Sequence, residues 1–130
     1  ILQCLIPPAA PFGFNDKVVI PVSGHHSPRF EVTGFRFGEL AYLTDFKTIG
    51  PAEERKLYGV EVLVVNALRP QPHDSHFSLA EALALISRVA PRRAYLTHMS
   101  HEMGLYAERS ALLPEGVYLA YDGLEINVND

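Results

Sequence analysis

Hydrophobic residues recur along the chain in short runs, and the spacing within each run predicts its secondary structure. Runs rich in β-branched and aromatic residues, which are typical of strands, lie at residues 17–22, 33–37, 40–44, 60–65, 93–97, 117–121 and 124–128. The pairs Gly38-Glu39 and Asp122-Gly123 separate neighbouring runs and predict two hairpins. Pro21 lies inside the first run, so we expect either a strand at a sheet edge or the end of a strand, because proline cannot donate a hydrogen bond to a neighbouring strand.

One helix signal is stronger than the others. Ser78 and Glu81 have the spacing of a capping box, in which each side chain pairs with the backbone of the other residue. Residues 79–89 then carry one hydrophobic stripe with helical spacing, and Pro91 ends the segment. Shorter helices are expected over residues 51–58, which begin with proline and acidic residues, and over residues 102–112.

The order of these elements predicts a layered α/β domain. Strands alternate with helices from residue 51 onward, and residues 60–65 are hydrophobic almost without interruption, as in a strand covered on both faces. Residues 1–16 are rich in proline and are expected to form a connecting segment. Residues 24–30 are expected to form a polar loop, and residues 17–130 a single body.

Composition narrows the class of protein. The chain has 130 residues, of which 48% are hydrophobic, and its net charge of −4 argues against binding along a nucleic-acid backbone. No hydrophobic run reaches the roughly 20 residues that span a bilayer, and one cysteine, Cys4, excludes an internal disulfide framework. We therefore expect a cytoplasmic protein. Because the chain begins at Ile1 rather than methionine, we also expect a processed chain or a fragment.

Candidate chemistry gathers where predicted strands end. Asp45 and His98 each follow a predicted strand directly, and His76 lies between a strand and the capped helix. The pair His25-His26 follows the first strand. Layered α/β proteins place their sites at such strand ends, and imidazole with carboxylate suits Zn, Mn or Fe. An aspartate after a strand is also a common turn residue, and a loop histidine is also a solvated hydrogen-bonding group, so spacing alone leaves a metal site open.

Four segments, taken together and in order, resemble one family. They are residues 34–45 (GFRFGELAYLTD), 72–83 (PHDSHFSLAEAL), 95–101 (YLTHMSH) and 121–126 (YDGLEI). Together they are similar to the C-terminal half of metallo-β-lactamase-fold hydrolases close to phosphoribosyl 1,2-cyclic phosphate phosphodiesterase, over about residues 17–128. The resemblance implies half of a four-layer αββα sandwich, that is, a mixed sheet with helices on one face.

The resemblance also implies a set of metal ligands. Asp45 resembles the carboxylate that bridges two metal ions, and His98 resembles a ligand of one of them. One member of the His25-His26 pair resembles the ligand of the other ion. We favour His26, because Ser27 follows it as in the family's His-Ser loop.

Other residues receive roles outside the ligand set. His76 resembles the histidine that contacts the phosphate and donates a proton or stabilises charge. His101 has a family counterpart, and we expect it to contact the metal ligands rather than the metal itself. Asp122 and Gly123 resemble a structural turn near the site.

The family's remaining ligands belong to a His-x-His-x-Asp-His motif, which this sequence does not contain. The resemblance thus implies that the chain supplies part of a site for two divalent metal ions, Zn, Mn or Fe. The expected function is a phosphodiesterase that cleaves small or cyclic phosphodiesters with metal-activated water, the 130-residue chain being inactive alone. Alternatives are a lactonase, a tRNA 3′-processing nuclease, or a non-catalytic half-domain. Besides substrate, the expected partner is the missing N-terminal half or a second copy of the chain.

Overall fold

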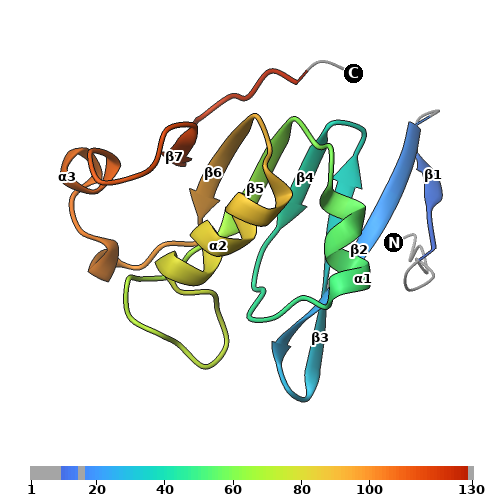
Figure 1. Cartoon of the computed structure of the whole chain (residues 1–130), viewed down its shortest axis with the longest axis horizontal. Helices are drawn as coiled ribbons and strands as arrows, with labels where there is room; N and C mark the ends of the chain where they lie inside the picture. Colours follow the sequence, from blue (N-terminus) through green and yellow to red (C-terminus); the bar gives the residue numbers. More distant parts are fainter. Residues whose placement is uncertain (1–9, 15–16, 129–130) are drawn as a thin grey trace.

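The described part of the chain, residues 10–14 and 17–128 of a computed structural model, forms a seven-stranded sheet with helices packed against it (Figure 1). The strands are β1 (Phe12–Phe14), β2 (Lys17–Ser27), β3 (Phe30–Phe37), β4 (Leu40–Leu43), β5 (Val62–Asn66), β6 (Arg93–Thr97) and β7 (Val117–Leu119). The helices are α1 (Pro51–Glu54), η1 (Arg55–Leu57), α2 (Leu79–Val89), η2 (His101–Met103) and α3 (Tyr106–Ser110). The strands lie in the sheet in chain order, which confirms the α/β class.

The first four strands form an antiparallel meander. β1 pairs with the start of β2, although the sequence predicts only a connecting segment there; residues 1–9 and 15–16 lie outside the described residues. The edge strand of the sheet is β1 and not β2. The prediction that Pro21 marks an edge strand is therefore wrong for the strand as a whole. The pairing with β1 nevertheless stops at Val19, so Pro21 lies beyond it, where the described residues place no strand on that side.

The polar loop expected over residues 24–30 is instead the tip of the β2–β3 hairpin. β2 continues to Ser27, and the chain turns only at Pro28-Arg29. The backbone of His25 pairs with β3 on one side and exchanges hydrogen bonds with Thr48 on the other. Backbone pairing on both sides holds this segment extended despite its polar side chains.

The last four strands run parallel to one another. β4, β5, β6 and β7 pair in register, joined by crossovers that contain the helices. α1 and α2 cover the same face of the sheet (Figure 1), which gives the expected mixed sheet with helices on one face. The helix predicted over residues 51–58 is confirmed as α1 continued by η1, and the helix after Ser78 is confirmed as α2.

The core lies between the parallel strands and α2. All five residues of β5 are buried, and Leu85 and Ile86 of α2 pack into the same cluster as Leu63 and Val65. The opposite face of the sheet carries aromatic residues in one cross-strand row. In that row Tyr42 and Tyr118 remain 42% and 47% exposed. One face of the sheet is therefore a closed core, and the other an open aromatic surface.

Two predictions near the C-terminus are wrong. The helix expected over residues 102–112 is divided into η2 and α3, because Gly104 between them adopts a left-handed φ of 91°. The hairpin expected over residues 117–128 does not form, because β7 pairs in parallel with β6 and residues 124–128 have no strand partner among the described residues. The turn at residues 121–124 does form, closed by a hydrogen bond from Leu124 N to Tyr121 O. No helix in the described ranges has the length and apolarity needed to cross a membrane.

Replacing Ser78 with alanine should lower the free energy of unfolding by about 1 kcal/mol. The Ser78 hydroxyl accepts a hydrogen bond from Glu81 N at 3.2 Å, and the Glu81 carboxylate accepts one from Ser78 N at 3.0 Å. Urea unfolding measures the change. Ser87→Ala, on the exposed side of the same helix, is the matched control and should change stability little; equal losses in both variants would contradict a specific role of the cap.

Candidate metal centre

The candidate site lies at the sheet edge where β4, β5 and β6 end. Asp45 follows β4 and His98 follows β6, and both residues adopt left-handed backbone conformations, with φ of 63° and 58°. Such a conformation is uncommon for residues other than glycine, and it turns the chain sharply at the end of each strand. His98 Nε2 consequently lies 3.3 Å from Asp45 Oδ1.

His76 enters this site from the loop between β5 and α2. Its Nδ1 lies 3.7 Å from Asp45 Oδ1, and its ring centroid lies 4.8 Å from those of His26 and His98. The side chain is only 14% exposed. Nδ1 is a buried polar atom without a hydrogen-bond partner among the described residues. A buried nitrogen of this kind is what a ligand or a bound ion would satisfy.

The structure distinguishes His26 from His25. The two residues are neighbours on β2, at an irregularity in the pairing with β3 that leaves His26 without a partner residue on that strand. His26 Nδ1 lies 3.0 Å from the backbone oxygen of Asp45, so the tautomer with a proton on Nδ1 donates this hydrogen bond and leaves Nε2 free. His25 is exposed and lines a separate hollow with Lys47 and Asp74. The geometry thus brings His26, the member of the pair favoured from the sequence, to Asp45.

The donor atoms are close enough to share a cation. One ligand atom each from His26, Asp45 and His76 lies within 4.8 Å of the other two. Imidazole nitrogen and carboxylate oxygen are the donors that Zn and related divalent metals take in proteins. With the unpartnered nitrogen of His76 and the free Nε2 of His26, the residues present fit a divalent metal ion. The compact group includes His76, for which the sequence predicts a role outside the ligand set, while His98 lies beside the same Asp45 oxygen, Oδ1.

Charge and burial act in opposite directions on His76. Burial lowers the pKa of its imidazole below the ordinary value of 6.5, and the neighbouring His98 and His26 lower the pKa further, whereas the carboxylate of Asp45 raises it. The net shift is downward, so the ring is neutral at pH 7. A neutral imidazole can serve as a metal ligand or as a hydrogen-bond donor.

The other histidines lie outside this group. His73 packs against His76 with centroids 5.2 Å apart, and its Nδ1 accepts a hydrogen bond from Ser75 N. His101 is exposed in η2. The supporting role expected for it from the sequence stays a prediction. His73 is partly buried beside the candidate site.

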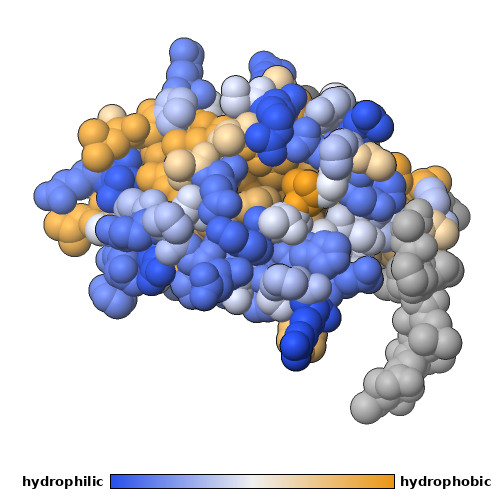
Figure 2. All heavy atoms as spheres, turned by 60° about the horizontal axis from the view of Figure 1, so that its bottom comes forward, coloured by the Kyte–Doolittle hydropathy of each residue, from blue (hydrophilic) through white to orange (hydrophobic). Residues whose placement is uncertain are grey.

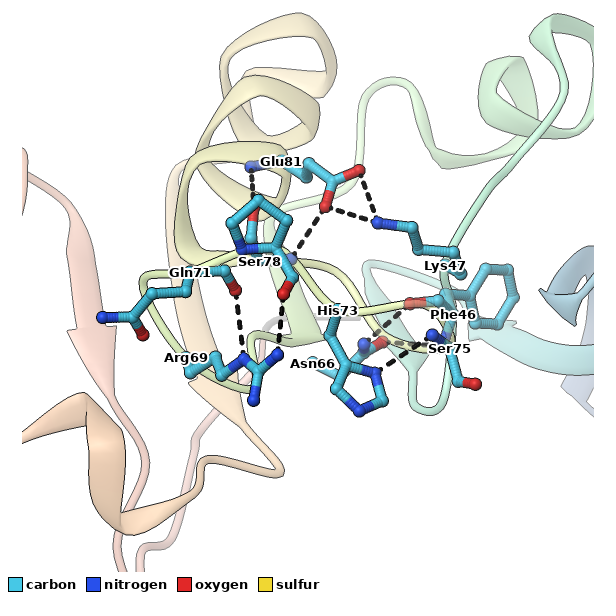
Figure 3. A network of polar contacts seen from close by, with 10 residues as sticks. Phe46, Lys47, Asn66, Arg69, Gln71, His73, Ser75, Ser78 and Glu81 are labelled. Atoms are coloured by element: carbon cyan, nitrogen blue, oxygen red, sulfur yellow. Dashed lines mark hydrogen bonds and ion pairs between the residues drawn. The ribbon is translucent and has the colours of Figure 1, made fainter.

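Polar contacts connect the segments next to the site (Figure 3). Asn66, at the end of β5, bonds to the backbone of Phe46, and Lys47 forms an ion pair with Glu81 at 2.9 Å. Sequence reasoning missed Asn66. The signal that could have found it is an amide side chain directly after four hydrophobic residues of a buried strand, where a polar group needs a partner.

Figure 2 turns the lower edge of Figure 1 forward, and polar side chains spread across the lower half of that view, with hydrophobic ones above.

Comparison with known proteins gives these residues a family context. The sequence model of the family described as "Beta-lactamase superfamily domain" matches residues 6–99. The solved structure of a diphosphatase from the PhnP family has a TM-score of 0.88 and 34% identity, covering 93% of this chain and 47% of that one. Zinc-bound PqqB from Methylobacterium extorquens shares the fold, with a TM-score of 0.68 and 14% identity over 95% of this chain and 55% of that one.

A curated relative is much longer than this chain. An octanoyltransferase of Porphyromonas gingivalis is 33% identical over 128 residues, which are 98% of this chain but 26% of that protein. The name describes the whole protein, so it does not say what the matched quarter does. The chain spans about a quarter of this curated relative and about half of the solved diphosphatase.

The pKa of His76 in the metal-free protein should respond in opposite directions to two substitutions. His98→Asn should raise it, because a neighbouring imidazole that opposes protonation is removed, and Asp45→Asn should lower it, because a stabilising carboxylate is removed. An NMR titration of the imidazole resonances measures both changes. Shifts of the same sign in the two variants would show that His76 does not face both groups.

Proposed function

Because the chain belongs to the beta-lactamase superfamily and has the metallo-β-lactamase fold, we propose that it forms part of a metal-dependent hydrolase of small or cyclic phosphodiesters. The observation that carries the proposal is the convergence of Asp45, His26, His76 and His98 from four separate segments. The likeness to a diphosphatase at 34% identity supports phosphorus–oxygen bond cleavage as the chemistry.

In this proposal Asp45, His26 and His98 hold the metal. His76 and His98 both lie beside Oδ1 of the Asp45 carboxylate, which has two oxygens with which to serve two ions. A divalent ion bound there would supply Lewis-acid activation of water and stabilise negative charge on the phosphate. His26 is prepared for such binding, because the hydrogen bond from its Nδ1 to Asp45 O fixes the ring and the tautomer.

His76 carries the catalytic role. Its lowered pKa keeps the ring neutral at pH 7, so that an N–H group can donate a hydrogen bond to a phosphate oxygen without a permanent charge. When the ring does take up a proton, the same lowered pKa makes the imidazolium a stronger acid than an exposed one. It is therefore suited to give a proton to the leaving oxygen.

The remainder of the site is proposed to come from outside these 130 residues. The chain matches about half of the diphosphatase structure, and one face of its sheet exposes aromatic side chains, including Tyr42 and Tyr118. Exposed hydrophobic sheet faces are normally covered by another layer. That layer would be the missing N-terminal half. The same face supports the second candidate, a non-catalytic half-domain that self-associates through it.

Asp45→Ala and His76→Ala separate metal binding from catalysis. In the whole protein that carries this chain, Asp45→Ala should lose metal, because it removes the shared carboxylate. His76→Ala should keep metal and lower turnover by roughly 10²–10⁴-fold, the range for loss of a general acid. Metal content by mass spectrometry and turnover measure the two effects.

His25 provides the matched control for the same experiment. His26→Ala should lose metal and His25→Ala should keep it, because only the side chain of His26 reaches Asp45. Equal metal content in the Asp45 and His76 variants would remove Asp45 from the site. Loss of metal from His76→Ala would instead make His76 a ligand, in line with its place in the compact donor group.

A substrate comparison tests the reaction class. A cyclic phosphodiester should be hydrolysed faster than a lactone or a tRNA precursor, because the proposed chemistry acts at phosphorus and the net charge of −4 disfavours a long polyanion. Turnover is measured for the three compounds with the same metal-loaded enzyme. A faster lactone would point to a different hydrolase of this fold, and no turnover with metal bound would favour the non-catalytic candidate.

A further inference from the structure

Asn66 is the last residue of β5 and has no solvent exposure. Both polar atoms of its side chain are used on one neighbouring residue. Asn66 Oδ1 accepts a hydrogen bond from Phe46 N at 3.0 Å, and Asn66 Nδ2 donates one to Phe46 O at 2.8 Å. The amide thus holds the backbone of Phe46 on both sides, as a neighbouring strand would (Figure 3).

The residue held in this way is the one next to Asp45. Asp45 has a left-handed φ of 63°, a conformation that a residue with a side chain keeps only when its surroundings hold it. Phe46 immediately follows it, and the Asp45 carbonyl receives the hydrogen bond of His26. Fixing Phe46 therefore fixes both the direction of the Asp45 carboxylate and the acceptor that orients His26.

The same point of the chain also connects to the other two histidine segments. The Phe46 carbonyl accepts a second hydrogen bond, from Phe77 N at 2.8 Å, and Phe77 directly follows His76. Ala67, the residue after Asn66, donates its N–H to Thr97 O at 3.0 Å, and Thr97 directly precedes His98. Residues 66 and 67 are thus linked by one or two hydrogen bonds to every segment that carries a candidate ligand.

We infer that Asn66 is a positioning residue of the candidate metal centre, which sets the spacing of Asp45 and His26 through the backbone of Phe46. The inference rests on the proposed function for its metal, but the hydrogen bonds that carry it belong to the chain itself. An amide is needed because the position must offer an acceptor to Phe46 N and a donor to Phe46 O at once. Leucine offers neither, and an ionised carboxylate offers only acceptors.

The test compares Asn66→Leu and Asn66→Asp with Leu57→Ala in the whole protein that carries this chain. Leu57 is fully buried in η1, before the start of β5, and its apolar side chain takes no part in the hydrogen bonds to Phe46, so its truncation lowers stability without removing them. Zn²⁺ affinity is measured by competition with a chelator. The Asn66→Leu variant should bind Zn²⁺ about 10- to 100-fold more weakly, the range for loss of a residue that orients metal ligands. Leu57→Ala should keep its affinity for Zn²⁺, although its thermal midpoint falls by as much as that of Asn66→Leu or more.

A second measurement needs no metal. In the metal-free protein, ¹⁵N shifts of His26 report which ring nitrogen carries the proton. We expect the Nδ1–H tautomer in the original protein and in Leu57→Ala, and a mixture of tautomers in Asn66→Leu, because the peptide that carries the Asp45 carbonyl is no longer held. Asn66→Asp keeps the acceptor for Phe46 N and should lose less Zn²⁺ affinity than Asn66→Leu.

The outcomes separate this inference from the proposed function. If Asp45→Ala loses metal but the Asn66 variants match Leu57→Ala in Zn²⁺ affinity and His26 tautomer, Asn66 is a structural residue only. If Asp45→Ala keeps its metal, the proposed centre fails, and the tautomer measurement alone judges the link from Asn66 to His26. Failure of both Asn66 variants to fold would overturn the inference, because the residue would then act on the whole fold.

Discussion

The parallel pairing of β4, β5 and β6 is the constraint on which the candidate site depends. Parallel strands that lie side by side end at the same edge of the sheet, so the residues that follow them meet there although they are far apart in sequence. Asp45 and His98 are separated by β5 in the sheet, yet their side chains approach to 3.3 Å. The loop that follows β5 brings His76 beside both of them.

This arrangement carries a conformational cost that the surrounding hydrogen bonds offset. Asp45 and His98 both lie in the left-handed region, at roughly 1–3 kcal/mol each for residues other than glycine. Around Asp45 the opposing contacts are visible. The Asn66 side chain bonds to the backbone N–H and carbonyl of Phe46, and Phe77 N donates to the same Phe46 carbonyl. His26 Nδ1 bonds to the backbone oxygen of Asp45. A site held by buried backbone contacts keeps its side chains in place before any ligand binds.

The sheet divides the molecule into two surfaces of different character. One face is closed by α1 and α2 over a fully buried β5, and the other presents aromatic residues that remain partly exposed. The edge that joins them carries the histidines.

The sequence by itself determined those elements whose signals are local. The capping box of Ser78 and Glu81, the uninterrupted hydrophobic run of β5 and the turn at Gly38 each depend on neighbours a few residues away, and all are present in the structure. The motif resemblance also selected Asp45, His26, His76 and His98 before their proximity was visible. What it could not supply was pairing. Which strands run parallel, where β2 ends and whether residues 124–128 find a partner depend on contacts between distant segments.

Only the tertiary structure decided how the candidate residues relate to one another. His25 and His26 are neighbours in sequence, but only the folded chain shows that His26 reaches Asp45 while His25 lines a separate hollow. The role of Asn66 likewise cannot be read from the sequence, because its hydrogen-bond partner Phe46 lies 20 residues earlier. Local propensity acts over a few residues, whereas these relations come from the pairing of strands that are distant in sequence. They can therefore be seen only in the folded chain.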